Sequence, residues 1–311
     1  MRLIRELTEG EAVREIYLCK QTQTLQTKAG KTYYSLVLQD KTGTLDGKVW
    51  DITNAIEHYE NGDFIHVDGR IVMFQDKPQL NISRIRRAGE GEYNPSDFMP
   101  SSDYDIEDMY RQLLALGATV KEPHLQALFK SFFIDDKEFI KAFKMHSAAK
   151  AVHHGFIGGL LEHTLSVTKL CDGFAKQYRI LNRDLLLTAA MCHDIGKIYE
   201  LSDFPENDYT DDGNLLGHIV MGVEMVGDKI RTIDGFPELL AKELKHCILA
   251  HHGKFEYGSP KLPAISEAMA LHFADNLDAK METMKELLNS VDDKATWLGY
   301  QKNFESNVRK T

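Results

Sequence analysis

The stretch "TAAMCHDIGKIYE" (188–200) places His193 and Asp194 side by side, directly after a run of small and apolar residues. Such a run predicts a helix that enters the protein interior. An imidazole or a carboxylate left unpaired there costs about a few kcal/mol. The pair therefore needs partners, and we searched the neighbouring helical segments for them.

Apolar residues at helical spacing predict about seven or eight helices between residues 106 and 288, and strand-like runs are absent there. These helices carry further histidines and an aspartate within or at the end of apolar stretches: His163, His218, His251, His252 and Asp275. A single buried histidine is usually a core residue with a hydrogen-bond partner. Several of them in one helical domain, with an adjacent His–Asp pair, indicate a shared metal site.

The donor types limit the choice of metal. Several imidazoles with carboxylates suit Mn²⁺, Fe²⁺, Co²⁺, Ni²⁺ or Zn²⁺, whereas Mg²⁺ prefers surroundings made of oxygen only. Two ions about 3.5–4 Å apart can hold a hydroxide at neutral pH, and that hydroxide can attack phosphorus in a phosphodiester.

The order H…HD…H…HH…D resembles the HD-domain superfamily of metal-dependent phosphohydrolases, on the residues His163, His193, Asp194, His218, His251, His252 and Asp275 together with Gly196 and Lys197. The resemblance implies that His163, His193, Asp194 and Asp275 hold one metal ion. It also implies that Asp194 bridges to a second ion held by His218 and His251, with His252 as another possible ligand. We expect two divalent ions and favour manganese, partly from this resemblance.

Two further residues are candidates for catalysis beside Asp194. Lys197, one turn past the pair, is placed to bind a phosphate or the leaving oxygen; a plain helix-end lysine is the alternative. His153 and His154 precede Gly158 and Gly159, where a helix start could admit a phosphate to backbone N–H groups. His154 could contact that phosphate, or be a loop histidine beside a tightly packed glycine.

Residues 1–88 are predicted to form an all-β domain. Alternating apolar residues and turn signals predict five strands, with a short helix over 55–63 between the third and the fourth. The pattern, with the hairpin "LQDKTGTLDGKVWD" (38–51), resembles the OB-fold barrel. Barrels of that kind stack bases on aromatic rings and follow phosphates with cations. The candidate contacts are Tyr33, Tyr34, Lys48, Trp50, Phe74, Arg84, Arg86 and Arg87.

The predicted architecture is therefore multidomain, with an all-β OB-fold barrel (1–88), a linker (89–105) rich in Gly, Pro, Ser and acidic residues, and an all-α HD-type helical bundle (106–311).

The net charge is −10, and residues 1–90 are neutral with 13 basic and 13 acidic side chains. Four widely spaced cysteines argue against a disulfide framework. No run approaches the ~20 apolar residues of a membrane span, and the N-terminus lacks the apolar core of a signal peptide. We expect a cytoplasmic protein without a membrane partner.

This combination of barrel, linker and HD domain resembles the YhaM-type 3′→5′ exoribonucleases of Gram-positive bacteria over essentially the whole chain. The resemblance implies removal of nucleotides from the 3′ end of single-stranded RNA, and of single-stranded DNA, with manganese and release of nucleoside 5′-monophosphates. Helical hydrolases often assemble, so we expect a homo-oligomer.

Three alternatives stay open from the sequence. The first is an HD-type phosphohydrolase or phosphodiesterase of nucleotides or cyclic dinucleotides, which would not need the barrel. The second is an oxygenase with a di-iron centre on the same helical scaffold. The third is a non-enzymatic single-strand DNA-binding factor in which the HD domain is only structural.

Overall fold

The computed structural model describes residues 2–53, 55–75, 77–94, 97–150, 154–289 and 296–311. The chain divides into two compact units. One comprises residues 1–101 with 203–207, and the other residues 102–202 with 208–311. No helix among the described residues is long and apolar enough to cross a membrane.

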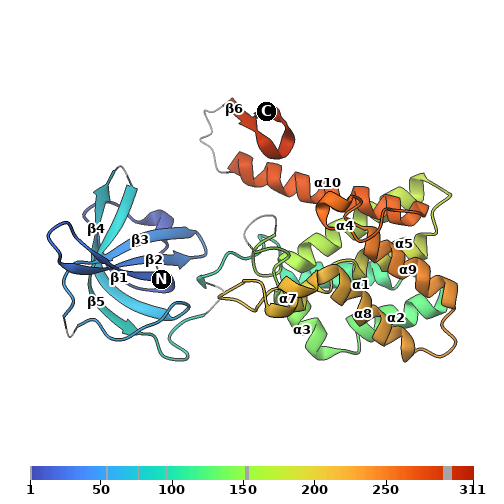
Figure 1. Cartoon of the computed structure of the whole chain (residues 1–311), viewed down its shortest axis with the longest axis horizontal. Coiled ribbons are helices and arrows are strands. Elements are labelled where there is room, and N and C mark those ends of the chain that lie inside the picture. The colour runs from blue at the N-terminus through green and yellow to red at the C-terminus, as the bar shows by residue number, and fades with distance from the viewer. Residues whose placement is uncertain (1, 54, 76, 95–96, 151–153, 290–295) are drawn as a thin grey trace. The chain divides into compact units, whose positions relative to one another are not determined.

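The N-terminal unit is a closed five-stranded barrel in the order β1-β2-β3-β5-β4 (Figure 1), with strands β1 (Ala12–Gln26), β2 (Thr32–Asp40), β3 (Gly43–Val49), β4 (Phe64–Phe74) and β5 (Lys77–Arg87). All neighbouring strands are antiparallel except β3 and β5, whose parallel pairing closes the barrel. Alternate side chains fill the interior, among them Tyr17, Leu38 and Ile65, each fully buried. The barrel predicted from the strand pattern is confirmed.

The helix predicted over 55–63 is wrong. The backbone there bonds to β5 instead, because Ile85 N donates to Ala55 O and Glu57 N donates to Ile85 O, each at 3.0 Å. Gly62 then turns the chain at φ 89°. A segment whose backbone groups are satisfied by a neighbouring strand has no need for helical bonds.

Part of the segment predicted as a linker lies against the barrel. The ring of Tyr93 stacks on that of Phe64, with centroids 4.0 Å apart, and Phe98 packs edge-on against Phe64 at 5.1 Å. Phe98 is only 2% exposed.

The second unit is a helical bundle, as predicted. Its α-helices are α1 (Ile106–Gly117), α2 (Pro123–Phe133), α3 (Lys137–Met145), α4 (Gly159–Gln177), α5 (Arg183–Cys192), α6 (Lys197–Glu200), α7 (Asp211–Leu215), α8 (Gly217–Arg231), α9 (Glu238–Ala250) and α10 (Ser266–Asn289). Several of these helices begin at a capping side chain: the side chains of Asp105, Glu122, Asp136, Asn182 and Thr210 each accept a hydrogen bond from the backbone N–H three residues on.

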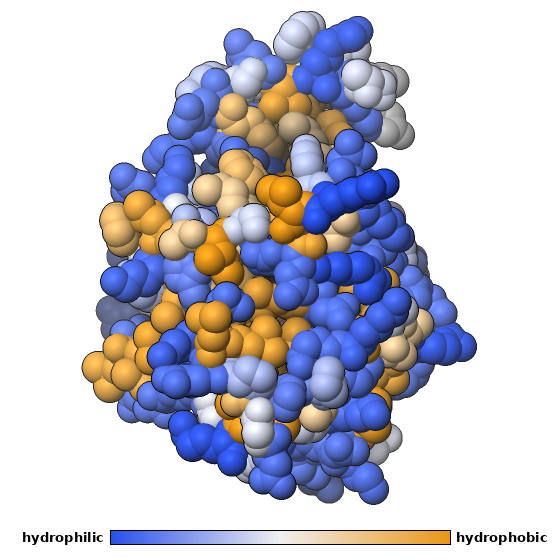
Figure 2. Space-filling view, turned by 90° about the vertical axis from the view of Figure 1, so that its right-hand side faces the viewer, coloured by the Kyte–Doolittle hydropathy of each residue, from blue (hydrophilic) through white to orange (hydrophobic). Residues whose placement is uncertain are grey.

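The helices share one apolar core, in which α2 packs against α5 and α3 against α4, and four phenylalanine rings of α2 and α3 are buried there: Phe129, Phe132, Phe133 and Phe143. Apolar side chains also reach the surface, and the face of the bundle seen in Figure 2 carries apolar patches among hydrophilic ones. Ile180 is 80% exposed and Tyr178 is 57% exposed.

The bundle ends in a hairpin that the sequence pattern did not indicate. Strands β6 (Trp297–Gln301) and β7 (Ser306–Arg309) pair antiparallel across the 3₁₀ turn η4 (Lys302–Phe304). The expectation of no strands beyond the linker is therefore wrong at this end of the chain.

Candidate metal centre

The predicted ligands come from helices α4, α8 and α10, from the turn between α5 and α6, and from the end of α9, and they meet in the bundle. His163 lies on α4, and Asp275 lies on α10. We expected His193 and Asp194 to lie on a helix, but they occupy the turn between α5 and α6. His218 is in the first turn of α8, and His251 directly follows α9. Helix ends leave the side chains free to converge while the helices themselves pack in the core.

Asp194 lies at the centre of the cluster and is 2% exposed. Its Oδ2 atom is 3.4 Å from Nε2 of both His163 and His193. Its other oxygen, Oδ1, is 3.4 Å from Nε2 of His218 and 3.5 Å from Nε2 of His251. One carboxylate thus faces two separate pairs of imidazoles, one pair with each oxygen.

Asp275 completes the first of these two groups. Its Oδ1 atom is 3.2 Å from Nε2 of His163 and 4.0 Å from Nε2 of His193. His163, His193 and Asp275 each offer a ligand atom within 4.8 Å of the others, which suits a single metal ion.

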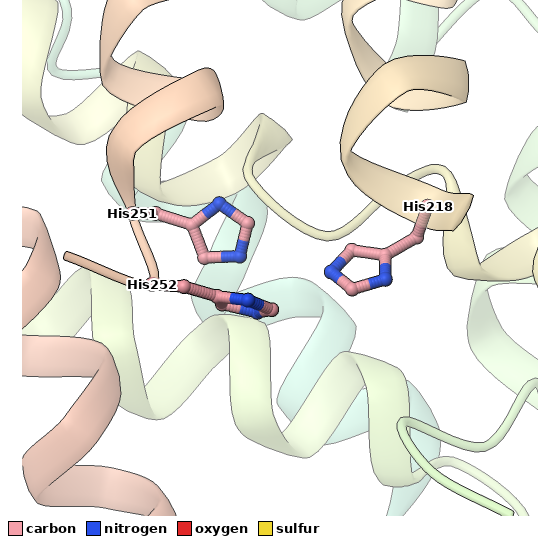
Figure 3. Close-up of side chains that lie close together, drawn as sticks. All are labelled: His218, His251 and His252. Atoms are coloured by element: carbon pink, nitrogen blue, oxygen red, sulfur yellow. The ribbon is translucent and has the colours of Figure 1, made fainter. Parts of the chain in front are cut away.

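His252 joins the second group (Figure 3). The rings of His218, His251 and His252 point toward one another from α8 and from the end of α9, and their ligand atoms lie within 4.8 Å of one another. The rings of His251 and His252 are 4.3 Å apart between centroids. Both histidines of the "HH" pair therefore lie in the cluster, and His251 is the one in reach of Asp194.

In a neutral imidazole, a hydrogen bond donated by Nδ1 leaves Nε2 without a proton. Nδ1 lies 2.7 Å from a backbone carbonyl oxygen in His193, His251 and His252, the carbonyls being those of Ala190, Ile248 and Tyr257. A carbonyl can only accept, so the proton is on Nδ1 and the Nε2 lone pair is directed into the cluster.

Carboxylates outside the predicted ligand set hold the other two imidazoles. Oδ2 of Asp278 is 2.7 Å from Nδ1 of His163, and Oε1 of Glu200 is 2.8 Å from Nδ1 of His218. Such outer carboxylates fix the orientation of metal-binding histidines. Sequence reasoning missed both residues. The available signal was weak: Asp278 follows Asp275 by three residues on one helix, and Glu200 ends the quoted stretch "TAAMCHDIGKIYE".

Three atoms show that a cation suits this cluster. Asp194 Oδ1, His218 Nε2 and His251 Nε2 are buried and have no hydrogen-bond partner among the described residues. Each such buried acceptor costs about 1–3 kcal/mol. Nε2 of His163 also lies 3.2 Å from Nε2 of His193, so two acceptors face each other unless a proton or a metal ion lies between them. The donor set fits divalent ions that accept nitrogen and oxygen.

The pKa shifts of Asp194, His251 and His252 agree with metal binding. Burial would lower the pKa of His163, but Asp194, Asp275 and Asp278 raise it well above its ordinary value, so a metal ion there would replace a proton. Burial alone would raise the pKa of Asp194, but Lys197 and His193 hold it well below its ordinary value. Burial lowers the pKa of His251, and burial with the neighbouring His251 lowers the pKa of His252 to about 4. Ionised carboxylates and neutral imidazoles are the forms that bind metals.

Lys197 is the first residue of α6 rather than a lysine at a helix C-terminus. Its Nζ atom is 2.6 Å from Asp194 Oδ2, and its side chain is 15% exposed. Burial would lower the pKa of Lys197, but Asp194 raises it, so the ammonium stays charged beside the cluster.

His154 lies behind the ligands. Its Nε2 atom is 3.2 Å from Asp278 Oδ2, and the residue is 2% exposed. A Cβ at Gly159 would lie 1.9 Å from the His154 carbonyl oxygen, so this glycine serves close packing of the chain. His153 lies outside the described residues.

A cavity of about 510 Å³ opens onto the cluster and is lined by His154, His163, Lys197, His252 and Asp275. It continues past side chains that no sequence motif singled out: Tyr257, Asn276, Lys280, Thr283 and Asn303. A substrate could therefore approach both the ionised carboxylates and the ammonium of Lys197 from one side.

The barrel presents part of the predicted aromatic set at its surface. The ring of Tyr33 stacks on that of Trp50 at 4.7 Å, and Phe74 is 58% exposed. Tyr34 is half-buried against the barrel core.

Three of the four predicted barrel cations have acidic partners. Lys48 pairs with Asp46, Arg86 with Glu92 and Arg87 with Asp63, at 2.7–2.8 Å. Arg84 is exposed. In the register of β4 and β5 it lies opposite Asp68. A phosphate would have to compete with the three acids.

Comparison with known proteins agrees with both units. The HD domain family matches residues 160–280, and the family described as "OB-fold nucleic acid binding domain" matches residues 18–88. A protein named "3'-5' exoribonuclease YhaM" from Geobacillus sp. (strain WCH70) is 36% identical over 286 residues, which cover 91% of this chain and 86% of that protein. The chain belongs to the YhaM exoribonuclease family.

Membership of the YhaM family makes the chain an enzyme of the nuclease class of hydrolases. Among solved structures, the second OB-fold domain of replication protein A from Methanococcus maripaludis covers 30% of the chain and 98% of that domain, with 19% identity and a TM-score of 0.24. The barrel, the HD bundle and the YhaM resemblance expected from the sequence are confirmed.

Proposed function

We propose that this chain removes nucleotides from the 3′ end of single-stranded RNA, and of single-stranded DNA, and releases nucleoside 5′-monophosphates. The observation that carries the proposal is the Asp194 carboxylate, whose two oxygens each face the Nε2 atoms of a pair of imidazoles. The activity printed in the name of the YhaM relative supports the substrate class and the direction.

His163, His193, Asp194 and Asp275 would hold one divalent ion, and Asp194, His218 and His251 a second, with His252 beside it. When bound, the two ions supply Lewis-acid charge for phosphoryl oxygens and make water a stronger nucleophile at neutral pH. Manganese is our first choice, and Fe²⁺, Co²⁺ and Zn²⁺ have compatible ligand preferences.

The chain's own residues position the strand and balance its charge. The ammonium of Lys197 lies at the cavity wall beside Asp194 and can pair with a non-bridging phosphate oxygen or the leaving oxygen. Hydrogen bonds to Asp278 and Glu200 fix the orientation of the His163 and His218 rings. His154 contacts Asp278 and therefore acts through it, or on a phosphate in the cavity.

The barrel would hold the strand upstream of the cut. The stacked pair Tyr33–Trp50 and the exposed ring of Phe74 can each receive a base, whereas Tyr34 packs against the barrel core. Lys48, Arg84, Arg86 and Arg87 would meet phosphates, which must replace their acidic partners. A homo-oligomer and a cytoplasmic location remain predictions from the sequence.

The test is incubation with a single-stranded RNA labelled at its 5′ end, with Mn²⁺ or with EDTA. We expect a ladder that shortens from the 3′ end with Mn²⁺ only. The double variant His193→Ala/Asp194→Ala should lose hydrolysis and keep strand binding. Asp228→Ala, an exposed change on the helix that carries His218, is the matched control. Parent-like degradation by the double variant would show that the chemistry lies elsewhere.

Substrate length separates the remaining alternatives. A phosphohydrolase of nucleotides or cyclic dinucleotides should cleave those substrates faster than a 20-nucleotide RNA. A binding factor should shift the RNA in a gel without any turnover.

A further inference from the structure

The C-terminal hairpin presents an aromatic face. The strand register pairs Trp297 with Arg309 and Tyr300 with Asn307. Residues paired across two strands lie on the same face of a ribbon, and so do residues two apart along one strand. Trp297, Tyr300, Asn307 and Arg309 therefore share one face.

A bulge makes this arrangement possible. Residues three apart on a regular strand point to opposite faces, but the register shifts between Trp297 and Tyr300. Gly299, at φ 73°, takes up the extra residue in a conformation that favours glycine. The opposite face is the packed one, since Val308 is 6% exposed.

The aromatic face is open. Trp297 is 64% exposed and Tyr300 is 65% exposed, and the guanidinium carbon of Arg309 lies 6.0 Å from the centre of the Trp297 ring. Two exposed rings with a cation beside them form the kind of surface on which single-stranded bases stack.

The charge of the hairpin differs from that of the rest of the domain. Residues 296–311 carry three basic side chains (Lys302, Arg309 and Lys310) and one acidic side chain (Glu305). Residues 91–295 carry 21 basic and 33 acidic side chains. A polyanion that approaches the acidic bundle is therefore attracted to the hairpin rather than to its surroundings.

The hairpin also borders the cavity of the candidate metal centre. Asn303, in the turn η4 between the two strands, lines the same cavity as His163, Lys197 and Asp275. A strand whose 3′ end lies at the cluster can continue past η4 onto the aromatic face.

We propose that the C-terminal hairpin is a second single-strand binding surface, on which Trp297 and Tyr300 stack bases of RNA close to the bond that is cut. This deepens the proposed function and rests on it. Asn303 and Lys280, which line the cavity between the cluster and the hairpin, would contact the backbone of the terminal nucleotides.

Tryptophan fluorescence tests the contact directly. The chain has two tryptophans, Trp50 and Trp297, so the variant Trp50→Phe reports on Trp297 alone. With Ca²⁺ or EDTA to prevent turnover, a single-stranded RNA of 20 nucleotides should quench this signal, and more weakly at high salt. A signal that does not change at saturating RNA would overturn the proposal.

The KM for RNA tests whether stacking on Trp297 and Tyr300 contributes to substrate binding. Trp297→Ala/Tyr300→Ala should raise KM for the 20-nucleotide RNA by about 5-fold to 150-fold per ring. Hydrolysis of bis-p-nitrophenyl phosphate, which is too small to reach the hairpin, should not change. Trp297→Phe keeps an aromatic ring at this position, so its KM for the RNA should be much closer to that of the parent than the KM of the alanine variant is. Tyr178→Ala, which removes an equally exposed ring in another pocket, is the control.

The outcomes separate the two proposals. If the parent protein cleaves the small ester but not RNA, the proposed function fails, and quenching of Trp297 still decides the hairpin. If the parent degrades RNA and the double variant has the same KM, only the hairpin proposal fails. An equal rise in KM for RNA in Tyr178→Ala would also refute the hairpin proposal, because the rise would then not depend on the aromatic face of the hairpin.

Discussion

Gly196 in the "HDIGK" stretch holds the two halves of the candidate centre together, and its replacement by alanine should separate them. A Cβ at Gly196 would lie 2.0 Å from the His218 carbonyl oxygen and 2.7 Å from the Gly222 nitrogen. Both are backbone atoms of α8, which cannot rotate away as a side chain can. Because real Cβ contacts are almost never below 3.0 Å, α8 has to retreat by about 1 Å.

The retreat carries His218 away from Asp194, from which it is now 3.4 Å distant. A shift of about 1 Å is roughly five times the ±0.2 Å tolerance of a metal–ligand distance. Misplacement on that scale costs a reaction about 10²-fold, while overpacking costs the fold about 1–3 kcal/mol. We therefore expect Gly196→Ala to fold, to bind fewer metal ions and to be about 100-fold less active.

Three measurements on one sample check this: metal content by mass spectrometry, unfolding by denaturant, and the rate of RNA shortening with Mn²⁺. Gly173→Ala is the matched control, because Gly173 lies in α4 with no other atom within 4 Å of an added Cβ. That control should be stabilised by about 0.4–1 kcal/mol, with unchanged activity. Parent-like metal content and rate in Gly196→Ala would refute the reasoning.

Three further predictions concern the supports of the centre and of the fold. Asp278→Asn should weaken metal binding about 10- to 100-fold, measured by competition with a chelating dye, whereas Asp278→Glu should recover part of it. EDTA should lower the melting temperature of the parent but not that of His193→Ala/Asp194→Ala, because only a protein that binds the ion is stabilised by it. Asp136→Ala should cost about 1 kcal/mol at pH 7, since Asp136 caps α3 and pairs with Lys229 at 2.8 Å. The hydrogen bond from Lys229 lowers the pKa of Asp136 in the folded protein, so its contribution is complete above the unfolded pKa of about 4 and is lost as the pH falls through the folded value. Unfolding curves at pH 7 and pH 3 should then show a smaller difference between parent and variant at the lower pH.

The convergence of the candidate ligands could be predicted from the sequence because the burial of such polar groups is costly. Each predicted imidazole or carboxylate interrupts an apolar stretch, and the adjacent pair His193–Asp194 marks where those stretches meet. The helical spacing then predicted the bundle, and strand alternation predicted the barrel.

The outer carboxylates could not be predicted in the same way. Glu200 and Asp278 lie at helix positions where acidic residues are common on surfaces, and nothing in their spacing says that they face His218 and His163. Their role depends on how α6 packs against α8 and α10 against α4, which is a tertiary property.

Two local predictions failed because a partner elsewhere decided the structure. Residues 55–63 have a helix-like composition, but the backbone bonds of Ile85 take them into an extended path. Residues 297–309 form a hairpin around the bulge at Gly299, and a short strand with a bulge lacks regular alternation. In both places tertiary context outweighed local preference.

The order of the converging side chains along the chain has a consequence for biosynthesis. The cluster starts at His163 and is complete only with Asp275, supported by Asp278. A growing chain on the ribosome therefore cannot assemble the centre until α10 has emerged, whereas the strands of the barrel end at Arg87 and can pair much earlier. An unfinished polypeptide would then be able to hold nucleic acid before it is able to cut it.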